Sequence, residues 1–131
     1  MGRNQTKKSC IEKLLLVMDQ NTSQKISSFL LKFVICESSY KALSGIVFKK
    51  AKKDIRLSEV IKVIRQLSMR ITEEMIEMLF GPNRTSGERS IKVLRNEIVH
   101  SLNKNAVSEV IDRYKSINEI MDAFIQAVTD V

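Results

Sequence analysis

The chain has 131 residues, 44% of them hydrophobic and 28% charged, a composition typical of one folded domain rather than a disordered chain. The formal net charge of +7 at pH 7 predicts a long-range attraction to polyanions. With five Phe, two Tyr and no Trp, a nucleic-acid partner would be held through its phosphates more than by base stacking. No apolar run approaches the roughly 18 residues of a membrane span, so we expect no membrane partner.

The N-terminus and the two cysteines indicate a cytoplasmic protein. Residues 1–6 are expected to be frayed, and the basic segment that begins the chain lacks the apolar stretch of a signal peptide. Cys10 and Cys36 lie inside helical patterns, with no second cysteine or histidine nearby, and are expected to be reduced core residues. No cluster of His, Cys and carboxylates suggests a metal site, and we expect no cofactor.

The first half of the chain is predicted to be helical. One Pro and four Gly are too few for a turn-rich β protein. Apolar spacing predicts a helix over residues 7–19 and a second helix that begins at Thr22 or Ser23 and continues to the basic run 49–53. We interpret that run first as a solvated helix end, with RNA contact as the alternative. A third helix is predicted over residues 54–69.

A short capped helix and a loop come next. Thr72, followed by Glu73 and Glu74, has the pattern of a helix cap with an acidic first turn. Gly81-Pro82 is a stop signal, and residues 81–90 form the one clear loop. This loop lacks the Gly-Lys-Ser/Thr ending of a nucleotide-binding P-loop.

The second half ends in a predicted amphipathic helix. Ser86 or Ser90 is expected to start a helix that Asn103-Lys104-Asn105 interrupts. The final segment repeats apolar residues at spacings of three and four, at Val107, Val110, Tyr114, Ile117, Met121, Phe124 and Val128. We therefore predict an all-α fold: residues 1–131 form a single helical bundle of four to five helices with a long C-terminal amphipathic helix.

The stretch LRNEIVHSLNKN, residues 94–105, holds the only histidine of the chain, His100. On an ideal helix Arg95 falls at the edge of an apolar stripe formed by Ile91, Leu94, Ile98 and Leu102. His100 lies about 140° around the helix from Arg95 and stacks with Asn96 on the opposite side. One straight helix cannot easily direct both side chains at one small target. Either the helix bends or ends near Asn103, or a second chain completes the site.

Spacing alone favours a structural role for this pair. A histidine on a polar helix face is usually a surface residue, and an arginine at a bundle edge often pairs with a glutamate.

The segment RNEIVH, Arg95 to His100, resembles the Arg-x4-6-His motif of the HEPN superfamily, small helical bundles found in prokaryotic toxins and antiviral systems. Asn96 fits the polar residue that commonly follows the arginine in that family. The motif also precedes a terminal helix, as it does there, and the resemblance covers about residues 86–124. Members that are paired with a nucleotidyltransferase antitoxin carry a tyrosine two residues beyond the histidine, where this chain has Leu102.

The resemblance implies a metal-independent endoribonuclease, a toxin or phage-defence effector that acts on RNA as a homodimer. Arg95, Asn96 and His100 would be the catalytic residues, with the motifs of both copies facing a shared cleft. An antitoxin, a nucleotidyltransferase or another protein, is the further partner that it implies. Cleavage by the 2′-hydroxyl of RNA needs a base, an acid and a cation, and two copies would supply two histidines.

Four basic residues near the motif are candidates for guiding RNA, although a solvated surface charge is the favoured interpretation of each: Arg84, Arg89, Lys92 and Lys104. A second hypothesis is a non-catalytic HEPN-like module that binds a protein partner or a nucleotide. A third, a basic helical nucleic-acid-binding protein, lacks a helix-turn-helix pattern in the right place.

Overall fold

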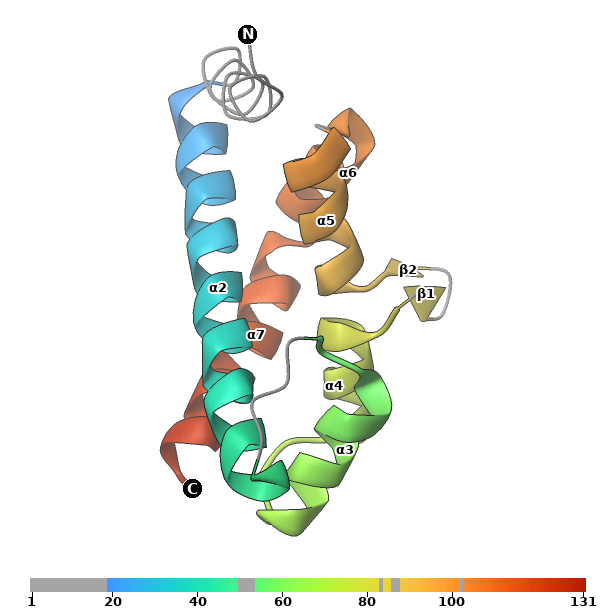
Figure 1. The fold of residues 1–131 in the computed structure, drawn as a ribbon. Coiled ribbons are helices and arrows are strands. Elements are labelled where there is room, and N and C mark those ends of the chain that lie inside the picture. The colour runs from blue at the N-terminus through green and yellow to red at the C-terminus, as the bar shows by residue number, and fades with distance from the viewer. Residues whose placement is uncertain (1–18, 50–53, 83, 86–87, 102) are drawn as a thin grey trace, which may run out of the picture.

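The computed structural model describes residues 19–49, 54–82, 84–85, 88–101 and 103–131. The described part confirms the all-α class, with six helices and one small hairpin (Figure 1). The elements in chain order are α2 (Gln20–Phe48), α3 (Leu57–Gln66), α4 (Glu73–Phe80), β1 (Arg84–Thr85), β2 (Glu88–Arg89), α5 (Ile91–Ser101), α6 (Lys104–Asp112) and α7 (Tyr114–Thr129). The helix predicted over residues 7–19 and Cys10 lie outside the described residues, apart from Asp19.

The long helix α2 packs its inner face against the rest of the bundle, chiefly α7 (Figure 1). Its buried residues recur at spacings of three and four, at Ile26, Phe29, Phe33, Cys36, Tyr40 and Leu43. Phe80 at the end of α4 contacts three other rings of the core, with centroid distances of 6.0 Å to Phe33, 6.0 Å to Tyr40 and 5.3 Å to Phe124. The buried residues of the described helices therefore form one continuous hydrophobic core.

The ends of α2 and α3 differ from the predicted ends. Asp19 caps α2, accepting a hydrogen bond of 2.8 Å from the Thr22 amide, so the helix begins before Thr22 or Ser23. Hydrogen bonds from Thr22 lower the pKa of the Asp19 carboxyl below its ordinary value. At the other end, Lys49 adopts a left-handed conformation with φ 55°, which ends α2 at Phe48. Helix α3 is shorter than the predicted 54–69, and the basic residues 50–53 lie outside the described part.

The predicted C-terminal helix is divided into α6 and α7 at Arg113, and with this division the described part of the chain has six helices rather than four to five. Val110 of α6 and Ile117 of α7 both face the core, so the apolar spacing runs through the break without a gap. At the other end of α6, the Asn103 side chain accepts a hydrogen bond of 3.1 Å from the Ala106 amide. The predicted interruption before α6 is confirmed.

The predicted features between residues 72 and 90 are largely confirmed. The Thr72 hydroxyl accepts a hydrogen bond of 3.2 Å from the Met75 amide, and α4 ends at Phe80. A Cβ atom at Gly81 would collide with the Glu77 carbonyl, so this close approach requires glycine. The predicted loop also contains a feature that was not predicted, the antiparallel pairing of β1 with β2.

Ser90, rather than Ser86, begins α5, the helix that carries the Arg-x4-His motif. The Ser90 hydroxyl accepts a hydrogen bond of 3.2 Å from the Val93 amide and donates one of 2.6 Å to the Gly81 carbonyl. Its side chain is buried, so this one hydroxyl joins the end of α4 to the start of α5. Residue 86 lies outside the described part.

Replacing Ser90 with alanine is expected to lower the free energy of unfolding by about 2 kcal/mol, because it removes a helix cap and leaves a buried carbonyl unpaired. Urea denaturation followed by circular dichroism measures the change. Ser101→Ala is the matched control, since Ser101 is exposed at the other end of α5. Equal stability of the Ser90 and Ser101 variants would contradict the assigned role of Ser90.

Within the described residues, no helix is both long and apolar enough to cross a membrane.

Candidate functional site

Arg95 extends from α5 toward α2, where it meets an acidic and an aromatic side chain. Its Nη2 atom lies 2.8 Å from Oε2 of Glu37, and both side chains are 22% exposed. The guanidinium carbon lies 4.8 Å from the centroid of the Phe33 ring, the geometry of a cation–π contact. Arg95 therefore lies at the expected edge of the apolar stripe, where it forms a half-buried ion pair that joins α5 to α2.

The Arg95–Glu37 pair holds the guanidinium in place without satisfying all of its donors. The Nε atom of Arg95 is buried and has no hydrogen-bond partner among the described residues. A half-buried pair with an unused donor stabilises the fold less than a fully bonded one. An anion that approaches Arg95 has to bind beside the Glu37 carboxylate or displace it.

His100 lies in the last turn of α5 and is exposed to solvent. The helix is continuous from Ile91 to Ser101, so the separation of about 140° between Arg95 and His100 is preserved. Asn96, four residues before His100, is half-buried on the same side of α5 as the histidine. The helix ends at Ser101, before Asn103, and is unbroken between the two motif residues, so a single chain directs Arg95 and His100 to different sides.

Two of the four basic residues proposed to guide RNA are engaged within the chain. Arg89 lies 3.2 Å from Glu97 and 3.4 Å from Glu109, measured between nitrogen and carboxylate oxygen. The Lys92 ammonium donates a hydrogen bond of 3.2 Å to the Ile55 carbonyl. Lys104 is exposed at the first position of α6, and the side chain of Arg84, on β1, lies outside what the structure describes.

Arg89 belongs to a half-buried charge cluster that joins β2, α5 and α6. Arg113 donates hydrogen bonds of 2.9 Å to the Arg89 carbonyl and 2.6 Å to the Glu109 carboxylate. Its other terminal nitrogen lies 3.5 Å from Glu88. These contacts fix the turn between α5 and α6, and so they fix the helix end that presents His100.

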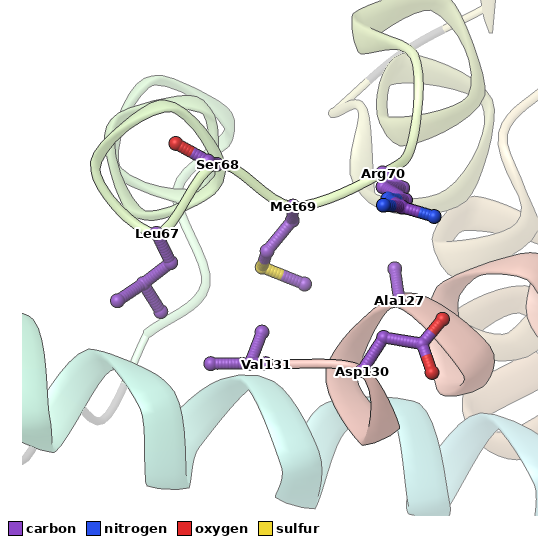
Figure 2. Close-up of a pocket in the computed structure, with 7 residues that line it drawn as sticks. All are labelled: Leu67, Ser68, Met69, Arg70, Ala127, Asp130 and Val131. Atoms are coloured by element: carbon purple, nitrogen blue, oxygen red, sulfur yellow. The ribbon is translucent and has the colours of Figure 1, made fainter.

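A cavity of about 350 Å³ lies at the end of the bundle away from the α5–α6 turn (Figures 1 and 2). The chain between α3 and α4 lines one side of it and the end of α7 the other; the lining residues are Leu67, Ser68, Met69, Arg70, Ala127, Asp130 and Val131. Figure 2 shows the Met69 side chain extending between the two walls. The cavity has the volume of a small-molecule site, but it contains none of the motif residues.

Cys36 is buried on α2, as predicted for a core cysteine. Burial raises the pKa of its thiol to about 12, and the nearby Asp122 carboxylate acts in the same direction. The thiol is therefore protonated and unreactive at neutral pH. No cluster of three or more metal-ligating side chains occurs among the described residues.

All three predicted catalytic residues lie on α5, but Arg95 faces α2 whereas His100 faces solvent. Sequence reasoning missed Glu37 and Phe33, which both contact Arg95 in the described part of the chain. Both lie on α2, far from the motif in the chain, and no local pattern connects them to it. Comparisons of the chain with protein-family models, with curated proteins and with solved structures found no match.

Proposed function

We propose that the chain is a HEPN-like, metal-independent endoribonuclease that acts on RNA as a homodimer, as a toxin or phage-defence effector. The observation that carries the proposal is the arrangement of Arg95, Asn96 and His100 on one continuous helix, with His100 exposed at its end. The net charge of +7 supports a polyanionic substrate. An antitoxin, a nucleotidyltransferase or another protein, would be the regulatory partner.

The proposed chemistry is an internal displacement at phosphorus. The 2′-oxygen of RNA attacks the adjacent phosphorus while a neutral imidazole takes the 2′-hydroxyl proton, and the bond from phosphorus to the 5′-oxygen breaks as an imidazolium gives that oxygen a proton. The products are a 2′,3′-cyclic phosphate and a free 5′-hydroxyl. Arg95 would stabilise the negative charge on the non-bridging oxygens, and Asn96 would orient the substrate or the His100 ring.

The need for two copies follows from the residues available. The chain contains one histidine, and base and acid roles are best filled by two groups. Within one chain Arg95 and His100 point to different sides of α5. A two-fold axis would bring a second Arg95 and a second His100 to the same phosphate.

Incubation of the purified protein with single-stranded RNA in excess EDTA tests the proposal. We expect cleavage, with products that carry 2′,3′-cyclic phosphates and 5′-hydroxyls. DNA of the same sequence is the matched substrate, and it should remain intact because it lacks the attacking 2′-hydroxyl. Cleavage that requires an added divalent metal, or that proceeds equally on DNA, would contradict the proposal.

A second candidate function is a non-catalytic HEPN-like module that binds a protein partner or a nucleotide. The Arg95–Glu37 pair favours it, because the charge of the motif arginine is already balanced inside the fold. The cavity beside Met69 gives such a module a site of suitable volume for a small ligand. In this case substitutions in the motif would lower the melting temperature and would have no cleavage to remove.

A further inference from the structure

The outer face of α2 carries exposed apolar side chains. The exposed fractions are 64% for Leu31, 51% for Val34, 44% for Ile35 and 68% for Ile46. On an α-helix these four positions fall within about 60° of one direction. Exposed apolar patches on a folded chain commonly mark interaction sites.

Three small residues lie on the same face of α2: Ser38, Ala42 and Gly45. We call these three residues and the four exposed apolar ones the α2 strip. It carries bulky side chains in its N-terminal part and at Ile46, its C-terminal end, and the small residues lie between them. A Cβ atom at Gly45 would meet nothing within 4 Å, so no neighbour in the described chain requires glycine there. Glycine inside a helix nevertheless costs about 1 kcal/mol relative to alanine.

Two ion pairs mark the flanks of the α2 strip. On one flank Lys32 lies 2.9 Å from Asp122 of α7, and on the other Glu37 pairs with Arg95 of α5. The helices of the bundle that contact α2 therefore pack on its inner side (Figure 1). The strip points away from them, and its apolar side chains face solvent in the described part of the chain.

The strip is self-complementary in shape when two copies of α2 pack antiparallel. With the two-fold axis at the midpoint between Leu31 and Ile46, Leu31 of each copy lies over Ile46 of the other. Val34 of each copy then lies over the small residues Ala42 and Gly45 of the other. Ile35 of each copy lies over Ala42 of the other. Ser38 lies beside the axis, where it meets Ser38 of the second copy. A two-fold interface requires this kind of self-complementarity, because one surface meets itself.

The charges beside the strip are complementary in the same arrangement. Lys41 is exposed on the flank of α2 that also carries Glu37. Antiparallel packing sets Lys41 of each copy on the same side as Glu37 of the other, at nearly the same height along the helix axis. Two attractive contacts between opposite charges therefore accompany the apolar one. We propose that a second copy of this chain binds the α2 strip through this two-fold contact.

The interface is expected to be weak. From Leu31 to Ile46 the strip is about 22 Å long, and a helix with its side chains is about 10 Å wide. Such a contact is smaller than the roughly 800 Å² that each partner buries in a stable complex. We therefore expect a dissociation constant on the order of micromolar, with dimers formed at higher protein concentrations.

The dimer deepens the proposed function, on which its catalytic consequence rests. Glu37 lies about 120° around α2 from Leu31 and close to the midpoint of the strip. A two-fold axis perpendicular to both helices keeps the same flank of each helix on one side of the dimer. Both Arg95–Glu37 pairs would then face one common side, near the axis, where a single RNA strand can contact both.

Sedimentation velocity at protein concentrations from about 1 to 200 μM tests the interface, because it distinguishes monomer from dimer without reference to RNA cleavage. The unmodified chain should change from monomer to dimer over this range, and Ile35→Glu should remain a monomer. Val131→Glu is the matched control, because Val131 is also an exposed apolar residue but lies outside α2, and its variant should dimerise normally. A monomer at every concentration, whether or not it binds lipid vesicles or another protein, would overturn the proposal. So would an Ile35→Glu variant that still dimerises.

Cysteine cross-linking tests the antiparallel register. In a chain with Cys10 replaced by serine, Ser38→Cys should form a disulfide-linked dimer under mild oxidation, because the two copies of residue 38 meet at the axis. Ser27→Cys is the matched control: Ser27 is exposed three turns earlier on the same face, and its two copies would lie about 34 Å apart along the helices. No cross-link through residue 38, or an equal one through residue 27, would overturn the register.

A charge reversal tests the contact between Lys41 and Glu37 of the other copy. Lys41→Glu places like charges beside each other in both of these contacts, so it should weaken dimerisation by about tenfold. Lys115→Glu is the matched control, because Lys115 is exposed on α7, away from the strip. Equal dimerisation by the two variants would overturn the charge contact. A dimer that cleaves no RNA would contradict the proposed function only, and an RNA-cleaving dimer that persists in Ile35→Glu would contradict the interface only.

Discussion

Replacing His100 with alanine is expected to slow RNA cleavage by about 10²- to 10⁴-fold, the usual contribution of a general acid or base. The side chain is exposed at the end of α5, so its loss should leave the melting temperature nearly unchanged. The measurement is the single-turnover rate on a short labelled RNA in EDTA, together with a thermal unfolding curve. A catalytic role for His100 predicts that the variant has a much lower cleavage rate but an unchanged melting temperature.

Lys104→Ala is the control for His100→Ala. Lys104 is also exposed, beside the same turn, and its loss removes a positive charge without removing an acid or base. We expect the cleavage rate of Lys104→Ala to fall by less than about tenfold, and the difference from the unmodified chain to shrink as the salt concentration rises, as for the loss of one contact to phosphate. Cleavage by His100→Ala at the unmodified rate would eliminate the histidine from the mechanism.

Arg95→Lys is expected to reduce cleavage by about 10- to 100-fold, because lysine retains the charge but loses the planar fork that binds two oxygens. The variant should also lose about 1 to 3 kcal/mol of stability, since the 2.8 Å contact with Glu37 and the packing on Phe33 are both altered. Rates are therefore compared at a temperature at which circular dichroism shows both proteins folded.

Glu37→Gln separates the catalytic role of Arg95 from its structural role. This variant weakens the same ion pair and lowers stability in a similar way, but it leaves the guanidinium in place and removes a negative charge beside it. At protein concentrations that keep the variant dimeric, we expect its cleavage rate to stay within about threefold of the unmodified rate. Equal losses of stability in Arg95→Lys and Glu37→Gln, with no difference between their rates, would favour the non-catalytic module.

The start and end signals of several helices were predictable because they depend on local hydrogen bonding. Thr72 and Asn103 accept hydrogen bonds from amides three residues ahead, which is what their short polar side chains favour at a helix start. The start of α2 was predicted a few residues late, because Asp19, Thr22 and Ser23 are all residues that can cap a helix. Sequence alone does not show which of these neighbouring residues caps the helix.

The break at Arg113 was not predictable from periodicity, because the apolar residues on either side of it keep the same spacing. Contacts from Arg113 to Glu109 and to the Arg89 carbonyl accompany the break, and the second of these depends on the position of β2. Arg89 is a candidate for guiding RNA in the sequence analysis because its partners could not be identified from the sequence. In the structure Arg89 forms ion pairs with Glu97 and Glu109. A single sequence contains no local pattern that indicates which distant charged residues form an ion pair.

The candidate site was predictable in part. The separation of Arg95 and His100 follows from helix geometry, and the continuous helix α5 preserves it. The partner of Arg95 was predictable as a type of residue, a glutamate at the bundle edge, but Glu37 could not be identified. Its helix is brought to α5 only by the packing of the core.

The central claim, that two copies share one site, is tested most directly by mixing the unmodified chain with an excess of His100→Ala. After subunit exchange, and with RNA in excess over total protein, the cleavage rate is measured at a fixed amount of unmodified chain. At a ninefold excess, random pairing leaves about one tenth of the unmodified chains in unmodified dimers, so the rate should fall to about a tenth if a shared site needs both histidines. A rate that is unchanged by the excess variant would show that each chain cleaves RNA alone.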